Sequence, residues 1–191
     1  MSSKNVFRNL GASNHSKEIR EENDYYATEP RAVKLLLDEE TFNANIWECA
    51  CGELHISNVL NEYGYNVRNS DLIKRVDEIE QLDFLQSNEK WHGDIITNPP
   101  YKYAQEFIEK SIDLIEDGNK VAMLLRLQFL EGKRRKELFK KYPPKYVYVF
   151  SGRINCAKNG DFITYNSSAL SYAWFVWEKG YKGETTIKWI N

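Results

Sequence analysis

The chain has 191 residues, 42% of them hydrophobic and 28% charged, with three cysteines and a formal net charge of −2. This length fits one domain with a core of its own, and the near-neutral charge excludes a uniformly basic nucleic-acid coat. None of the cysteines forms a Cys-x-x-Cys pair, and no apolar run reaches the roughly 18 residues of a membrane span, so we expect a soluble, cytoplasmic protein without a disulfide framework.

The first half of the chain predicts an arm followed by alternating strands and helices. Residues 1–23 are rich in Asn, Ser and charge and predict a flexible arm, and residues 24–191 predict a single domain. Apolar spacing and breaker residues then predict, in chain order, a helix opening at Pro30, a strand at 46–48, a helix at 56–63 ended by Gly64, and a strand at 65–70.

The second half continues the alternation and ends in β segments. The predicted elements are a strand at 94–97, a helix at 104–115, a strand at 121–125, a basic helix at 130–142, and β segments at 146–150, 169–177 and 185–190. The turn at 178–180 predicts that the last two segments pair antiparallel. We therefore expect an α/β three-layer sandwich of Rossmann-like type, with a mostly parallel sheet and a C-terminal antiparallel hairpin.

Ligands of such sheets bind beyond the carboxyl ends of the strands, so the residues that follow each strand are the candidate site. These segments are 48–52, 71–72, 83–84 and 98–101. An acidic residue after the second strand suits ribose hydroxyls, and a turn of small residues after the first strand lets a ligand approach the backbone. This pattern favours a cofactor that contains adenosine.

The segment 94–101, Asp-Ile-Ile-Thr-Asn-Pro-Pro-Tyr, resembles the NPPY motif of S-adenosylmethionine-dependent amino methyltransferases, chiefly those that methylate adenine N6 in DNA. The resemblance covers most of the chain from Asp24 onward. Further segments resemble, in the order of the gamma-type arrangement, the other motifs of small phage and prophage adenine methyltransferases: 24–30, 48–54, 71, 83–84 and 174–180.

The resemblance implies S-adenosylmethionine as the cofactor and implies roles for individual residues. The cofactor-binding residues would be Tyr26, Thr28, Glu48, Ala50, Cys51, Gly52, Asp71, Leu72, Asp83, Phe84 and Asn98. The catalytic residues would be Asn98, Pro99, Pro100 and Tyr101. The Asn98 side-chain oxygen and the Pro99 carbonyl would accept the two N–H groups of the adenine amine, and Tyr101 would stack on an extruded base. The amine is a poor nucleophile until its lone pair is localised on nitrogen.

The first motif, residues 48–54, contains an unusual residue, Leu54, and overlaps a group of potential metal ligands. Leu54 stands where the family usually has a second glycine, so it could narrow the cofactor pocket, weaken cofactor binding or be absorbed by a shifted turn. Cys49, Cys51 and His55 match no common zinc spacing and lack a fourth ligand, so we expect no metal.

Charge is distributed unevenly along the chain. Residues 120–158 hold eleven Lys or Arg residues and two acidic ones. We expect this segment to contact the phosphates of DNA or RNA through Arg126, Lys133, Arg134, Arg135, Arg153 and Lys158. A solvated helix face is the alternative for the run at 133–136.

The chain leaves little room for a target-recognition domain. Sequence specificity would then come from short loops such as 151–168, from a partner protein or from a homodimer. The NPPY chemistry also suits an RNA adenine or a protein glutamine, and a binding module with a degenerate cofactor site is a non-catalytic alternative. The resemblance places the protein in the cytoplasm of a bacterial or phage-infected cell.

Overall fold

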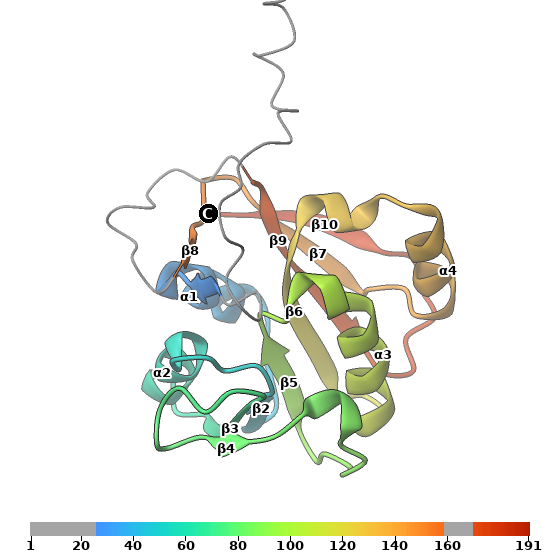
Figure 1. The fold of residues 1–191 in the computed structure, drawn as a ribbon. Helices are drawn as coiled ribbons and strands as arrows, with labels where there is room; N and C mark the ends of the chain where they lie inside the picture. The colour runs from blue at the N-terminus through green and yellow to red at the C-terminus, as the bar shows by residue number, and fades with distance from the viewer. Residues whose placement is uncertain (1–25, 159–169) are drawn as a thin grey trace, which may run out of the picture.

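The computed structural model describes residues 26–158 and 170–191 (Figure 1). The predicted N-terminal arm and most of the 151–168 loop lie outside the described residues. The β strands are β1 (Tyr26–Thr28), β2 (Asn45–Glu48), β3 (Asn66–Asp71), β4 (Glu80–Gln81), β5 (Asp94–Thr97), β6 (Lys120–Arg126), β7 (Tyr146–Phe150), β8 (Cys156–Lys158), β9 (Tyr172–Glu178) and β10 (Thr186–Ile190). The α helices are α1 (Pro30–Glu39), α2 (His55–Glu62), α3 (Ala104–Leu114) and α4 (Lys133–Lys141), and the 3-10 helices are η2 (Phe84–Gln86), η3 (Tyr101–Tyr103) and η4 (Leu127–Leu130).

Eight strands form one sheet in the order β10-β7-β9-β6-β5-β2-β3-β4. All neighbouring pairs are parallel except those of β9, which runs antiparallel to both β6 and β7. This confirms the α/β fold with a mostly parallel sheet. The strand order reverses between β2 and β5, so their carboxyl ends form the switch point where ligands of such sheets bind.

The predicted C-terminal hairpin is wrong, because β9 and β10 do not pair. The strand β9 is buried along six of its seven residues and has β6 on one edge and β7 on the other. Neither edge of β9 is left for β10, which pairs in parallel with the outer edge of β7. The more polar strand therefore takes the edge of the sheet, and the apolar strand takes its interior.

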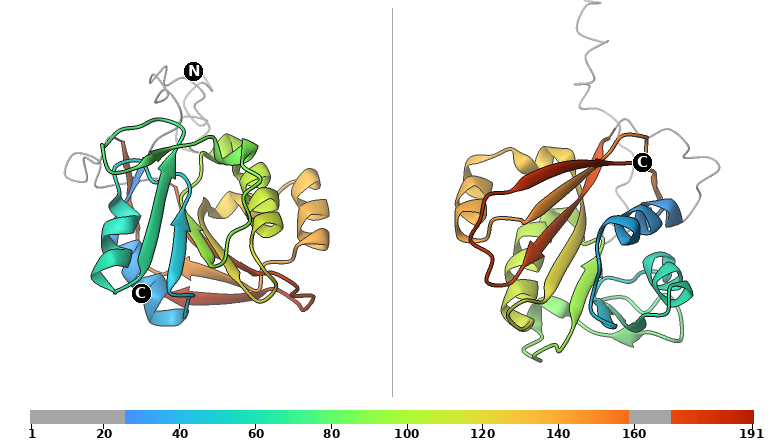
Figure 2. Two further views of the ribbon diagram at one scale, coloured as in Figure 1. Left: turned by 90° about the horizontal axis from the view of Figure 1, so that it is seen from below. Right: turned by 180° about the vertical axis from the view of Figure 1, so that it is seen from behind.

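The helices cover both faces of the sheet, as the left view of Figure 2 shows. One core cluster packs α1 and α2 against the sheet, and the other packs α3 and α4 against the opposite face. The buried indole N–H groups have acceptors: Trp47 donates to Ser70 Oγ at 2.8 Å and Trp174 donates to the Ala32 carbonyl at 2.7 Å. No helix in the described part of the chain is both long and apolar enough to cross a membrane.

A second, two-stranded sheet forms at the carboxyl end of the main sheet. Strand β1 pairs antiparallel with β8, with Thr28 opposite Cys156. Two further hydrogen bonds extend the pairing, from Glu29 N to the Asn155 carbonyl at 3.2 Å and from Asn155 N to Glu29 Oε2 at 2.9 Å. The sequence predicted neither strand, because each has only three residues. We call this element the β1–β8 ribbon.

Candidate active site

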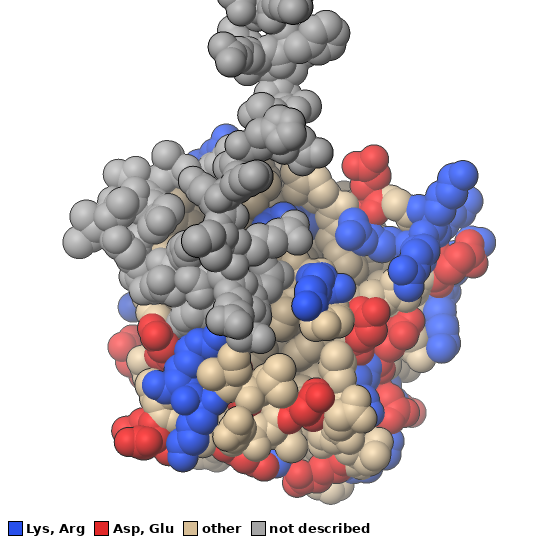
Figure 3. Space-filling model, viewed as in Figure 1, with Lys and Arg blue, Asp and Glu red and all other residues tan. Residues whose placement is uncertain are grey.

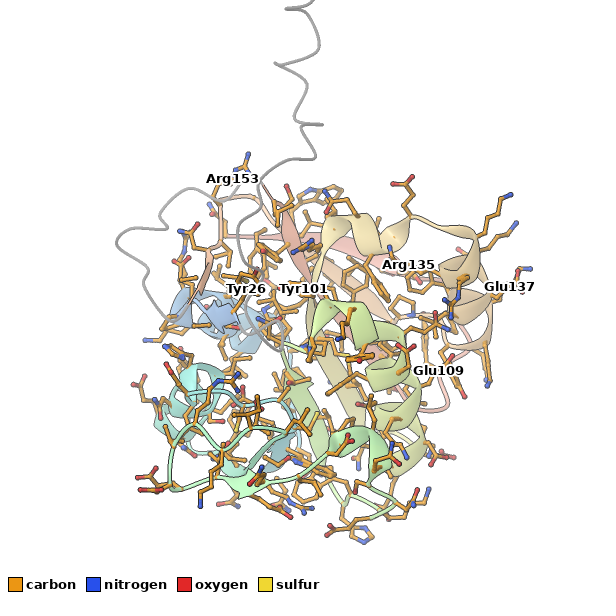
Figure 4. All side chains as sticks on the ribbon, viewed as in Figure 1. Tyr26, Tyr101, Glu109, Arg135, Glu137 and Arg153 are labelled. Carbon is orange, nitrogen blue, oxygen red and sulfur yellow. The ribbon has the colours of Figure 1, made fainter. Side chains whose placement is uncertain are left out.

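A cavity of about 380 Å³ lies where β2, β3 and β5 end and the β1–β8 ribbon begins. Figure 4 labels Tyr26 and Tyr101, two of its lining residues, which lie close together. The predicted site residues that line the cavity are Tyr26, Thr28, Glu48, Ala50, Cys51, Asp71, Leu72, Asp83, Phe84, Asn98, Pro100 and Tyr101. Gly52 and Pro99 are buried and do not line it. The fold thus gathers the four strand-end segments and residues 26–28 at one place.

Asp71 is the last residue of β3, and its carboxylate accepts two backbone hydrogen bonds. Its Oδ2 accepts the Gly52 N–H at 2.9 Å, and its Oδ1 accepts the Ile73 N–H at 3.0 Å. The Arg75 guanidinium lies 3.3 Å from the same Oδ1. The carboxylate therefore orders the turn after β2 and its own turn, and it remains on the cavity wall.

Glu48 ends β2 as a buried carboxyl group, and burial raises its pKa to about 8 despite a hydrogen bond with Ser57. Ser57 Oγ hydrogen-bonds both Glu48 Oε2 and Asn69 Oδ1. A hydroxyl has one proton, so Ser57 can donate to only one of these two oxygens at a time. Burial therefore favours the neutral form of the Glu48 carboxyl group.

Asp83 and Phe84, which were predicted to bind an adenine ring, have different environments. Asp83 Oδ1 caps η2 by accepting the Leu85 N–H at 3.0 Å. The Phe84 ring is almost fully buried, stacked on Phe107 at 5.1 Å and edge-on to Trp47 at 5.1 Å. Phe84 is therefore mainly a core residue. The apolar side chain that the cavity wall exposes is Leu72, which is 56% accessible.

Asn98 follows β5, and its side-chain amide is oriented by β1. Asn98 Nδ2 donates to the Tyr26 carbonyl and to Thr28 Oγ1, each at 3.1 Å. A backbone carbonyl can only accept, so the amide nitrogen must face β1 and the amide oxygen is the remaining acceptor. No donor from the described residues is bonded to that oxygen.

Tyr101 occupies the last position of the NPPY turn, residues 98–101, in a packed environment. Its hydroxyl donates to Cys156 Sγ at 3.8 Å, and burial raises the pKa of this phenol. The Arg126 guanidinium lies 4.8 Å from the ring centroid, and the Tyr172 ring lies at 6.2 Å. The Arg126 guanidinium thus packs against the Tyr101 ring, and Tyr101 is also one of the residues that line the cavity.

Leu54 adopts φ 67° and ψ 22°, the left-handed conformation that glycine tolerates best. It is the only non-glycine residue with positive φ in the described ranges. Its side chain does not line the cavity. The expected narrowing of the pocket is therefore absent, and the departure from the family pattern costs backbone strain instead.

The basic residues predicted to bind nucleic acid do not share one environment. Lys133, Arg134 and Lys136 are exposed in the first turn of α4, where Figure 3 shows basic side chains gathered at one edge of the molecule. Arg135 instead donates to the carbonyls of Gln128 and Glu131 at 2.9 and 3.0 Å. Arg153 is exposed near the top of Figure 4, and Lys158 contributes its backbone to β8.

The cavity also has lining residues that the sequence analysis did not select. They are Ala27, Cys49, His55, Ile56, Arg75, Leu82, Leu85, Gln86, Lys102, Tyr103 and Phe107. Lys102 and Tyr103 directly follow the NPPY turn, so the motif itself was a signal for them. Tyr103 is 43% accessible, and Lys102 Nζ lies 4.5 Å from its ring centroid.

Comparisons with known proteins identify the fold of the chain but match its sequence to no family. No protein-family model and no curated protein matches the sequence. Solved structures do match. A Listeria monocytogenes protein, provisionally classed as a class I S-adenosylmethionine-dependent methyltransferase, superposes with a TM-score of 0.56 at 13% identity, over 82% of this chain and 62% of that one. The fold is that of class I methyltransferases.

Two further structures share the class I fold with this chain. A predicted O-methyltransferase from Agrobacterium tumefaciens has a TM-score of 0.60 at 11% identity, covering 84% of each chain. A modification subunit provisionally assigned to a type I restriction enzyme of Vibrio vulnificus has a TM-score of 0.60 at 12% identity. That match covers 86% of this chain and 46% of the Vibrio chain. The chain thus spans less than two thirds of the Listeria and Vibrio proteins.

Proposed function

We propose that the protein transfers a methyl group from S-adenosylmethionine to the N6 amine of adenine in DNA. The observation that carries this proposal is the orientation of Asn98. Its amide nitrogen is held by β1, so an acceptor oxygen is fixed at the end of β5, beside a cavity lined by acidic and apolar groups. An acceptor at this point suits a substrate with an amino group.

The cavity residues fit the proposed cofactor. A volume of about 380 Å³ lies within the usual range for small-molecule sites. Asp71 would accept the ribose hydroxyls, Leu72 would cover one face of the adenine ring, and Asp83 would accept from the adenine amino group. Glu48 lies where a carboxylate could face the ammonium group of the methionine part. When bound, the cofactor supplies a methyl group carried on a positively charged sulfur.

The NPPY turn would prepare the substrate amine for attack. Asn98 Oδ1 and the Pro99 carbonyl would each accept one N–H group, which draws the nitrogen towards tetrahedral geometry and localises its lone pair. The nitrogen gains positive charge as its bond to the methyl carbon forms. The two acceptors therefore stabilise the transition state more than the ground state. Tyr101, which lines the cavity, would stack on the extruded base.

The charge distribution favours a nucleic-acid substrate. The first turn of α4 holds four cationic residues and no acidic one, although the positive end of a helix dipole lies there. Three of these cations are exposed. Cations in this position destabilise the isolated helix, and phosphate groups would offset that cost. Among the structural neighbours, a modification subunit provisionally assigned to a restriction enzyme supports a DNA substrate, and a protein provisionally assigned as an RNA methyltransferase keeps RNA as the alternative.

Radiolabelled methyl transfer to pools of DNA, RNA and protein, followed by mass spectrometry of the nucleosides, tests the proposal. We expect N6-methyladenine in DNA. Replacing Asn98 with Ala removes one of two preorganised acceptors and should lower turnover about 10²–10³-fold, with a smaller effect on cofactor affinity. Asn61→Ala, on the exposed side of α2, is the matched control. Methylcytosine, or label only in protein, contradicts the assignment, and label only in RNA keeps the chemistry and changes the substrate.

A further inference from the structure

The two functional side chains of the NPPY turn are held by opposite strands of the same ribbon. Asn98 Nδ2 donates to the Tyr26 carbonyl and to Thr28 Oγ1 in β1. The Tyr101 hydroxyl donates to Cys156 Sγ in β8. Thr28 and Cys156 are themselves direct partners across the ribbon. One cross-strand pair thus contacts both ends of the turn.

We propose that Thr28 and Cys156 are positioning residues, which fix the Asn98 amide and the Tyr101 ring for the transfer reaction. The inference rests on the proposed function, because it assigns these two residues to orienting catalytic groups. It also changes the role of Thr28, which the sequence assigned to cofactor binding. The threonine hydroxyl can still donate its own proton, so the two roles are separable by experiment.

Thr28 adds a second hydrogen bond to the amide orientation that the Tyr26 carbonyl selects. Its side chain is buried, and its Oγ1 accepts from the same amide nitrogen as the Tyr26 carbonyl. If the amide were rotated by 180°, its oxygen would face the Tyr26 carbonyl and its NH₂ group would face the substrate amine. Two donors would then oppose each other, and the amine would lose an acceptor. The Tyr26 carbonyl, which can only accept, therefore selects the observed orientation, and the second bond to Thr28 Oγ1 holds the amide in it.

Cys156 acts on the position of the aromatic ring. The Tyr101 hydroxyl donates to the Cys156 thiol in β8, and Cys156 is not a lining residue of the cavity. Burial raises the pKa of Cys156 to about 12, so the sulfur is a neutral acceptor at physiological pH. The hydrogen bond fixes one end of the ring, while Arg126 and Tyr172 contact its surface. A ring held in this way loses little entropy when a base stacks on it.

The β1–β8 ribbon connects the contacts of Asn98 with β1 to the contact of Tyr101 with β8. Three residue pairs define its register, and the hydrogen bonds between Glu29 and Asn155 extend it by one more pair. A shift of β1 relative to β8 would therefore move the acceptors of Asn98 and the acceptor of Tyr101 relative to each other. We infer that the ribbon sets the spacing between the amine acceptor and the stacking surface.

Thr28→Val tests the first contact, because it removes the acceptor and keeps the shape. We expect kcat to fall about tenfold to a hundredfold, the affinity for S-adenosylmethionine by calorimetry to stay within about threefold, and Thr28→Ser to restore most of the rate. The ¹⁵N signals of the Asn98 side-chain amide should shift in Thr28→Val and return in Thr28→Ser. An unchanged kcat, or a parallel loss of cofactor affinity, overturns the role of Thr28.

Cys156→Ala tests the second contact and should mainly raise KM for the nucleic acid, with Cys156→Ser in between. An effect confined to kcat, or none, overturns the role of Cys156.

The ¹⁵N signals of the Asn98 side-chain amide distinguish a failure of this inference from a failure of the proposed function. If the wild-type protein transfers no methyl group to any substrate but its Asn98 signals still depend on Thr28 Oγ1, the proposed function fails and the positioning contact stands. If those signals are independent of Thr28, the inference fails whatever the activity.

Discussion

The backbone N–H of Gly52 donates to Asp71 Oδ2 at 2.9 Å, which ties the turn after β2 to the end of β3. A second bond from Cys51 N to the Ser70 carbonyl at 3.1 Å lies beside it. The two turns that form one wall of the cavity are thus joined without any ligand. Asp71 has a structural role in the site as well as its proposed role in ribose binding.

Asp71→Asn should weaken binding of S-adenosylmethionine about tenfold to a hundredfold. The amide keeps one acceptor oxygen but loses the negative charge and one of the two acceptors that now hold Gly52 and Ile73. Isothermal titration calorimetry measures the change, with Asp38→Asn on the exposed side of α1 as the control. Equal affinities in the two variants would show that Asp71 is not part of the cofactor site.

At position 54, the N-cap of α2, Gly should give a more stable protein than Ala by about 1 kcal/mol. The left-handed backbone costs a non-glycine residue about 1–2 kcal/mol, and Gly avoids that cost but adds about 0.4–1 kcal/mol of unfolded-state entropy. Urea unfolding of Leu54→Gly and Leu54→Ala measures the difference. Asn58 is an exposed position within α2, and there the Asn58→Ala variant should be more stable than Asn58→Gly.

The contribution of Glu48 to the free energy of unfolding should fall as the pH rises from about 4.5 to about 8. In this window the folded protein keeps the Glu48 proton, because its pKa is about 8, while the unfolded chain releases it near 4.5. Stability is therefore lost with rising pH, at up to about 1.4 kcal/mol per pH unit from this group. Glu48→Gln has no such proton and should give a flatter profile in urea unfolding at several pH values. Parallel profiles would show that Glu48 is ionised in the folded protein.

Neutralising Arg134 and Lys136 to Gln should have opposite effects on binding and on stability. DNA affinity should fall and the slope of log affinity against log salt should decrease by up to about 2, because about 0.9 is lost for each phosphate contact. Stability should rise by about 0.3–1 kcal/mol per residue, since each cation leaves the positive end of α4.

Fluorescence anisotropy with duplex DNA at several salt concentrations, together with thermal unfolding, measures both effects. The matched control is Lys90→Gln with Lys182→Gln, which makes the same change in charge near Asp113, at the far end of α3 from the NPPY turn. If the control lowers the salt slope equally, the α4 residues are only a solvated helix face.

Local patterns in the sequence determined most of the elements and the location of the cavity. Strands β2, β3, β5 and β6 and helices α1 to α3 were predicted from apolar spacing, because burial of one face or of a whole strand leaves a period in the sequence. The strand-end residues could be selected because parallel strands bring their carboxyl ends to one edge of the sheet. That rule holds for any chain with this alternation, so Glu48, Asp71 and Asn98 could be grouped before their positions were known.

Only the tertiary structure decided which strands pair at the C-terminus and how the NPPY turn is held. A turn such as 178–180 indicates a change of direction, but the partner of β10 depended on competition for the edges of β9 between segments far apart in the chain. The pairing of Thr28 with Cys156 likewise joins residues that no local pattern relates, in strands too short to show a period. The hydrogen bonds of Asn98 to β1 follow from that pairing, because a side chain's partners are set by the packing of distant segments and not by its neighbours in sequence.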